Sequence, residues 1–123
     1  MNTRIRALHF IFIGYAAVVI TISLIPSGDI TVVTNLDKLF HFTMYFFMAL
    51  LALVAFQSLW SRILALMFTY GLGFMLEWGQ GFVAYRTPSM TDNLANILGA
   101  SLGIVVFLLW QKFTASRLEK QVD

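Results

Sequence analysis

The chain alternates long apolar runs with short polar segments, and this pattern predicts four membrane-spanning helices. The apolar runs lie at about residues 7–25, 39–59, 63–82 and 94–110. A hydrocarbon core of ~30 Å needs about 20 apolar residues in a helix, so each run is long enough or nearly so. Because backbone groups in lipid must be paired internally and the runs lack the alternation of barrel strands, we expect helices. The first run is longer than the apolar region of a signal peptide, so we expect it to be retained.

The composition excludes a water-soluble monomer. Apolar residues make up 59% of the 123 residues and charged residues 11%, whereas soluble domains average about 25% charged residues. The net charge of +2 is too small to suggest a nucleic-acid partner, and without cysteine there is no disulfide or thiolate metal site. The fold class is therefore expected to be all-α: a membrane protein with a single transmembrane domain, a four-helix bundle over residues 1–123.

The basic residues predict how the bundle is oriented. Two of them, Lys38 and Arg86, fall on one side of the four-span arrangement and six fall on the other. The positive-inside rule places the side with six, and with it both termini, in the cytoplasm. These six residues are Arg4, Arg6, Arg62, Lys112, Arg117 and Lys120.

Polar and small residues form three stripes where the predicted helices reach the outer side. One face of the second helix carries Asp37, His41 and Tyr45, spaced i, i+4 and i+8. Because the other two stripes lie at the same depth, we predict a polar, partly hydrated pocket that opens outward. Small residues in the fourth helix would allow close helix approach. The other stripes are Tyr70, Gly73, Glu77 and Gln80 in the third helix, and Asp92, Asn96, Gly99 and Gly103 in the fourth.

The residues near the starts of the second and fourth helices also have structural explanations. Thr34 and Ser89 each precede an aspartate by three residues, which is the spacing of a capping box. Asp37 and Asp92 would then also complement the helix dipoles. Lys38 can extend its stem along the bundle and place its ammonium group at the interface. A cap does not exclude a role in a site, so both explanations stay open.

Glu77 is the strongest functional candidate. An ionisable group inside a span costs about 2.5–3.5 kcal/mol on insertion scales, so its presence favours a function. Its expected partner is Arg86, whose planar guanidinium suits a carboxylate or a phosphate. The alternative is an internal pair between the two that only fixes the loop. Asn96 and Gln80 could orient this pair or hydrogen-bond a ligand.

Three motifs in a fixed order resemble the VanZ-like family. They read D-K-x-x-H-F-x-x-Y at 37–45, E-x-x-Q at 77–80 and R-x-x-S-x-x-D-x-x-x-N-x-x-G-x-x-x-G at 86–103. The resemblance implies a small multi-pass protein of the bacterial cytoplasmic (inner) membrane, in a family whose namesake is associated with resistance to the glycopeptide teicoplanin. It implies no particular reaction.

Three functions remain open from the sequence. The first is binding or modulating an anionic lipid, a lipid-linked cell-wall precursor or a glycopeptide target in the outer pocket, with membrane lipids as partners. The second is an intramembrane enzyme in which Glu77, His41 and Asp37 act as acid–base groups. The third is a structural membrane scaffold.

The expected binding residues are polar side chains of the three stripes together with two basic residues. We assign no metal site and expect no cofactor, although the carboxylates and the imidazole could supply oxygen and nitrogen ligands. The binding residues are Asp37, Lys38, His41, Tyr45, Glu77, Gln80, Arg86, Asp92 and Asn96.

Overall fold

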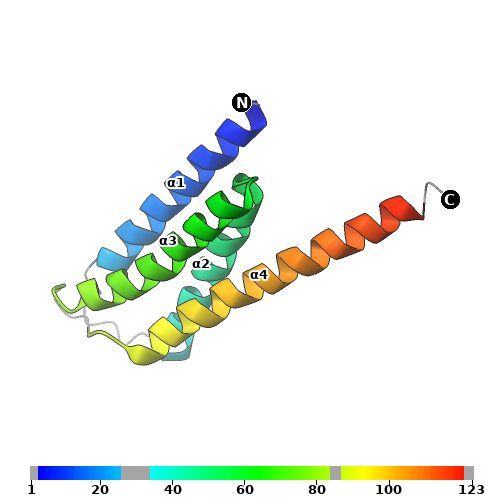
Figure 1. The fold of residues 1–123 in the computed structure, drawn as a ribbon. Coiled ribbons are helices and arrows are strands. Elements are labelled where there is room, and N and C mark those ends of the chain that lie inside the picture. Colours follow the sequence, from blue (N-terminus) through cyan, green and yellow to red (C-terminus); the bar gives the residue numbers. More distant parts are fainter. Residues whose placement is uncertain (1–2, 26–33, 84–86, 121–123) are drawn as a thin grey trace.

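The computed structural model describes residues 3–25, 34–83 and 87–120, and in these ranges the chain forms four helices and no strand (Figure 1). The apolar composition and length of every one of these helices suit a membrane span. The predicted all-α membrane fold is therefore confirmed, while the cytoplasmic placement of the termini stays a prediction. The helices are α1 (Thr3–Leu24), α2 (Thr34–Ala55), α3 (Leu59–Gln80) and α4 (Met90–Glu119).

The connection between α2 and α3 is shorter and earlier than the apolar runs indicate. Residues 56–58 leave the helical path, whereas the apolar pattern placed the turn after about residue 59. The hydroxyl of Ser58 accepts a hydrogen bond from the backbone N–H of Ser61 at 3.1 Å and caps α3. A capping side chain satisfies a backbone donor that the first helical turn leaves unpaired. The cap, and not the end of the apolar run, therefore sets the start of α3.

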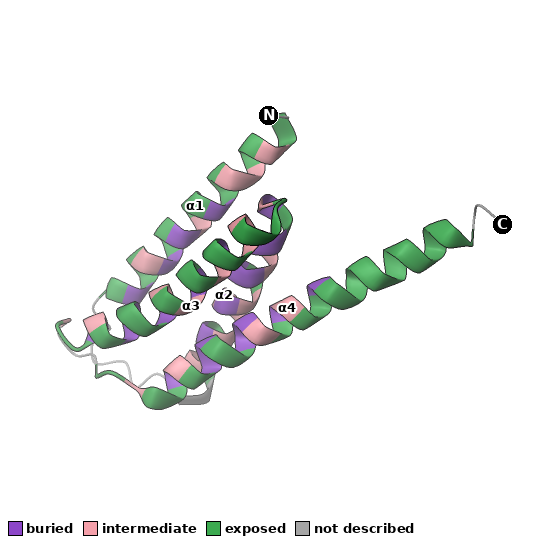
Figure 2. Cartoon of the chain, viewed as in Figure 1, coloured by how far each residue is buried: buried purple, intermediate pink, exposed green. Residues whose placement is uncertain are grey.

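The last helix is longer than a bilayer core requires. It contains 30 residues, which at a rise of 1.5 Å per residue makes about 45 Å, against ~30 Å of hydrocarbon. Its residues beyond Phe107 are exposed, and Figure 2 shows this half of α4 extending away from the other helices. A helix can continue where its side chains reach water, so α4 runs past the predicted end near residue 110 into the basic segment.

The tightest packing in the bundle lies between α2 and α4, which share the most extensive interface of any helix pair. A Cβ atom added to Gly99 would lie 2.1 Å from the carbonyl oxygen of Phe42, and one added to Gly103 would lie 2.6 Å from that of Phe46. Two helix backbones approach this closely only where the residue between them has no side chain. The predicted close approach at these glycines is confirmed, and it brings the polar stripes of α2 and α4 together.

Arg62 connects the α2–α3 turn to α4. Its Nε donates a hydrogen bond to the carbonyl oxygen of Phe56 at 2.8 Å, and its guanidinium carbon lies 5.2 Å from the ring centroid of Phe107. The planar guanidinium group makes both contacts at once, whereas the single ammonium group of a lysine can make only one of them at a time.

We expect the substitution Arg62→Lys to lower the free energy of unfolding by about 1 kcal/mol, because either the hydrogen bond to Phe56 or the cation–π contact with Phe107 is lost. Thermal unfolding of the detergent-purified protein measures this effect. The matched control is Lys112→Ala, which removes an exposed charge on α4. Equal unfolding midpoints for wild type and Arg62→Lys would contradict the assignment.

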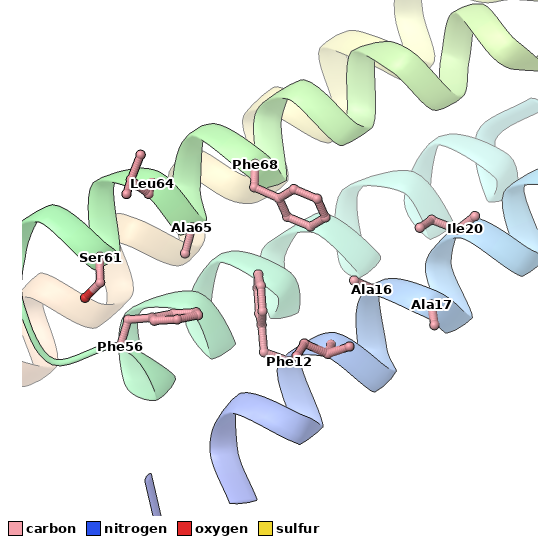
Figure 3. Close-up of a pocket in the computed structure, with 10 residues that line it drawn as sticks. Phe12, Ala16, Ala17, Ile20, Phe56, Ser61, Leu64, Ala65 and Phe68 are labelled. Atoms are coloured by element: carbon pink, nitrogen blue, oxygen red, sulfur yellow. The ribbon is translucent and has the colours of Figure 1, made fainter. Parts of the chain in front are cut away.

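A groove of about 550 Å³ lies between α1 and α3, and Phe56, just after α2, also lines it (Figure 3). Phe12 of α1 and Phe68 of α3 face each other across it, with ring centroids 6.1 Å apart. Of the ten residues that line it, only Ser61 has a polar side chain. This surface suits contact with hydrocarbon and supplies no groups for recognising a polar ligand.

Candidate functional site

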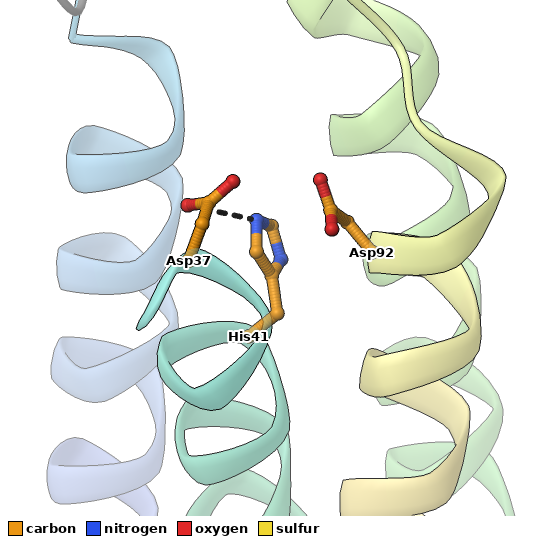
Figure 4. Close-up of side chains that lie close together, drawn as sticks. All are labelled: Asp37, His41 and Asp92. Atoms are coloured by element: carbon orange, nitrogen blue, oxygen red, sulfur yellow. Dashed lines mark ion pairs between the residues drawn. The ribbon is translucent and has the colours of Figure 1, made fainter. Parts of the chain in front are cut away.

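Polar side chains of α2 and α4 meet where both helices begin, at the end of the bundle opposite the N-terminus. Asp37 and His41 of α2 face Asp92 of α4 (Figure 4). His41, Asp92 and Asn96 are buried, and Asp37 and Lys38 are half-buried. We call these five residues the α2–α4 polar cluster. The convergence expected from helical spacing is therefore present for the stripes of these two helices.

His41 is held between the two helices by both of its ring nitrogens. Its Nδ1 lies 2.9 Å from Oδ1 of Asn96, and its Nε2 lies 3.9 Å from Oδ1 of Asp37. A carbonyl oxygen only accepts hydrogen bonds, so Nδ1 of His41 carries a proton and donates it. The other ring nitrogen is left facing a carboxylate. The hydrogen bond to Asn96 of α4 thus fixes the orientation of the His41 imidazole on α2.

Lys38 and Asp92 form an ion pair across the same interface, with 3.8 Å between Nζ and Oδ1. The half-buried side chain of Lys38 thus lies beside a carboxylate of the cluster. Spacing along one helix could not show this contact, because it joins two elements far apart in the chain. The expectation that the ammonium group of Lys38 reaches the membrane interface stays a prediction.

Ser89 caps α4, as the capping-box spacing predicted. Its side-chain oxygen accepts a hydrogen bond from the backbone N–H of Asp92 at 3.3 Å. The carboxylate of Asp92 meanwhile points toward Lys38, so the cap and the cluster coexist at one residue. The matching expectation for Thr34 concerns a side chain outside the described residues.

Glu77 is buried at 5% exposure and holds the connection between α3 and α4. Its Oε1 accepts a hydrogen bond from the backbone N–H of Ser89. This partner was not predicted from the sequence, although the unpaired N–H groups at a helix N-terminus are a recognisable partner for a nearby carboxylate. The expected partner Arg86 lies outside the described residues, so that pairing stays a prediction.

Four buried polar atoms in this part of the bundle have no hydrogen-bond partner among the described residues. Leaving such a group unpaired costs about 1–3 kcal/mol, and a native protein normally satisfies it with protein, water or a ligand. These atoms are therefore expected to have partners beyond the described side chains and backbone, such as water or a ligand. The four atoms are the Tyr45 hydroxyl, Oε2 of Glu77, Nε2 of Gln80 and Oδ1 of Asp92.

A small cleft of about 140 Å³ adjoins Glu77 between the end of α3 and the start of α4. Exposed apolar side chains, among them Phe74, Trp78 and Met90, form its walls. The buried carboxylate of Glu77 therefore borders a recess between these two helices, a feature that the sequence did not predict.

Comparison with protein families decides the relationship of the chain. The pattern of the VanZ/LLP1 family matches residues 4–111, which is nearly the whole chain. The chain belongs to the VanZ/LLP1 family. The match confirms the resemblance drawn from the three motifs and extends it to the first helix, which none of the motifs includes.

A relative of this VanZ/LLP1 chain occurs in a eukaryote. An uncharacterized protein of the fission yeast Schizosaccharomyces pombe is 36% identical over 91 residues, which are 68% of this chain and 52% of the yeast protein. The chain thus spans about half the length of this curated relative. No solved structure matches the chain. The family match and the four apolar helices together indicate a multi-pass membrane protein of this family. Its location in the bacterial inner membrane stays a prediction.

Proposed function

We propose that this VanZ/LLP1 protein binds the polar headgroup of an anionic lipid or a lipid-linked envelope precursor at the α2–α4 polar cluster. The observation that carries the proposal is the set of four buried polar atoms that have no hydrogen-bond partner among the described residues. A ligand that brings its own hydrogen-bonding groups would satisfy these atoms. A ligand with an apolar tail would remain in the bilayer while it does so.

The cleft beside Glu77 supports a lipid rather than a water-soluble ligand. Its walls include Phe74 and Trp78 of α3 and Met90 of α4, all of them exposed. Acyl or prenyl chains would lie against these side chains in the bilayer. The headgroup would then reach the buried end of the cleft from the side.

Two kinds of side chain in the site would bind different parts of the headgroup. Lys38 supplies a positive charge within the cluster, and Arg86, the other basic residue predicted on this side, follows α3 in the sequence. These two would bind phosphate oxygens, while Asn96 and Gln80 would bind sugar or glycerol hydroxyls. Binding an envelope precursor in this way would also connect the protein to glycopeptide resistance, since such antibiotics act on the envelope.

We expect Lys38→Ala to weaken binding of an anionic lipid about tenfold, because a charge-assisted contact is worth at least about 1.5 kcal/mol. Native mass spectrometry of the purified protein, titrated with phosphatidylglycerol, phosphatidylcholine and polyprenyl diphosphate, measures the affinities. The unfolding midpoint should change little, because an ion pair with a half-exposed lysine contributes about 0–1 kcal/mol. Lys112→Ala is the control and should bind like wild type. Equally weak binding of all three lipids by wild type, Lys38→Ala and Arg86→Ala would refute the proposal.

An intramembrane enzyme is the second candidate, and the position of His41 favours it. An imidazole fixed by Asn96 and facing a carboxylate has the arrangement that proton transfer requires. Catalysis by these residues predicts that Glu77→Gln and His41→Ala fail to complement a deletion strain while folding normally. Full complementation by both variants would eliminate this candidate.

A further inference from the structure

Three side chains of the α2–α4 polar cluster present ligand atoms to a common point. One atom each of Asp37, His41 and Asp92 lies within 4.8 Å of the other two (Figure 4). Ligand atoms around an ion at a distance of about 2.1 Å lie about 3–4 Å apart. Shifts of about 1 Å in the carboxyl groups would therefore close this arrangement around a cation.

The hydrogen bonding of His41 matches that of a metal ligand. Its Nδ1–H donates to Oδ1 of Asn96, which leaves Nε2 on the side of Asp37. In metal sites the coordinating histidine nearly always donates its other N–H to a carbonyl or carboxylate oxygen, which fixes the tautomer and the orientation of the ring. Asn96 holds the imidazole of His41 in this way.

A second and independent observation is a buried carboxylate oxygen that has no hydrogen bond. Asp92 is only 7% exposed, and its Oδ1 accepts no hydrogen bond from any described residue. The nearest described cation is Nζ of Lys38 at 3.8 Å, which is too long for a hydrogen bond. A buried carboxylate is stable only with cations or hydrogen-bond donors close to it, and Oδ1 of Asp92 has lone pairs that can take a cation in addition to the ion pair with Lys38.

We propose that Asp37, His41 and Asp92 bind a divalent cation, held in place through Asn96. Two carboxylates and one imidazole are hard and borderline ligands, a set that suits Mn²⁺ or Zn²⁺ better than Ca²⁺, which prefers oxygen ligands alone. This site replaces the sequence-based assignment of no metal. It deepens the proposed function and rests on it for its role, since the cation would give an acid-rich cluster a positive group that binds a phosphate headgroup.

The competing explanation is an ion-pair network without metal. In that network His41 carries a second proton and pairs with Asp37, while Lys38 pairs with Asp92. Both arrangements use the same residues, but only one of them takes up a cation. Direct metal binding therefore separates the two.

The experiment is a titration of the detergent-purified full chain, stripped with EDTA, with Mn²⁺ followed by electron paramagnetic resonance. We expect one bound Mn²⁺ per chain and displacement by Zn²⁺. His41→Gln and Asp92→Asn should weaken binding at least 100-fold, and Asn96→Ala about tenfold or more, as for other residues that orient a ligand. Asp37→Asn provides a half-buried variant in case Asp92→Asn fails to fold. The controls His9→Gln and Glu119→Gln should bind like wild type.

Two results would overturn the metal site: no Mn²⁺ binding by wild type, or binding that folded His41→Gln and Asp37→Asn retain in full. The lipid titration, repeated on the EDTA-stripped protein, keeps this test separate from the proposed function. Lipid binding that persists without Mn²⁺ binding leaves the proposed function and rejects the metal. Mn²⁺ binding without lipid binding in either form rejects the proposed function and leaves the metal.

Discussion

Gly99→Ala is expected to lower the free energy of unfolding by about 3 kcal/mol or more. The new methyl group would lie 2.1 Å from the carbonyl oxygen of Phe42, a distance at which the two helix backbones must separate. Inserting a single methylene into a well-packed core already costs about 1–3 kcal/mol, and here the neighbour is backbone that cannot rotate away. Thermal unfolding in detergent measures the loss.

The chain offers a matched control for this substitution. Gly71 is also helical, and a Cβ atom added there would meet nothing within 4 Å. Alanine is the better helix former by about 0.5–1 kcal/mol, so Gly71→Ala should be as stable as wild type or slightly more so. If Gly99→Ala and Gly71→Ala unfolded at the same temperature, the close approach of α2 and α4 would be contradicted.

Glu77→Ala is expected to be less stable than Glu77→Gln by about 1–3 kcal/mol. Alanine removes the oxygen that accepts the backbone N–H of Ser89 and leaves this donor unpaired. Glutamine keeps an acceptor oxygen at the same place, so the start of α4 stays fixed. Thermal unfolding gives the difference, and hydrogen exchange at the amide of Ser89 shows whether this bond is its cause.

The comparison between the two variants isolates the hydrogen bond from the charge, because both remove the carboxylate. Faster exchange at Ser89 should occur in Glu77→Ala alone. The account would be wrong if the two variants had equal stability and equal exchange at Ser89. Glu77 would then contribute through its charge and not through the capping of α4.

The helices of this fold were predictable because long apolar runs in a chain with few charges have few alternatives in a bilayer. Their ends were less so. The apolar run continues through Phe56, yet the helix stops at Ala55 and Ser58 caps the next one. A cap depends on a hydrogen bond of a single polar side chain, so the pattern of apolar residues does not predict its position.

The site was predictable as far as it depends on spacing within a helix. The i, i+4 relation placed Asp37 and His41 on one face, and the shared depth of the stripes brought Asp92 and Asn96 near them. Contacts that depend on how two helices pack were not predictable. The carboxylate of Glu77 accepts a hydrogen bond from the backbone N–H of Ser89, because the connection between α3 and α4 places the start of α4 beside it. The geometry of this connection cannot be read from helical periodicity.

The most direct test of the central claim is photo-crosslinking with an anionic lipid that carries a photoreactive group in its headgroup. The account predicts that labelled peptides, identified by mass spectrometry, come from residues 34–45 and 87–96, and that Lys38→Ala reduces this labelling. Labelling concentrated in the basic segment at 111–120, and equal in wild type and Lys38→Ala, would contradict the claim that the α2–α4 polar cluster binds the headgroup.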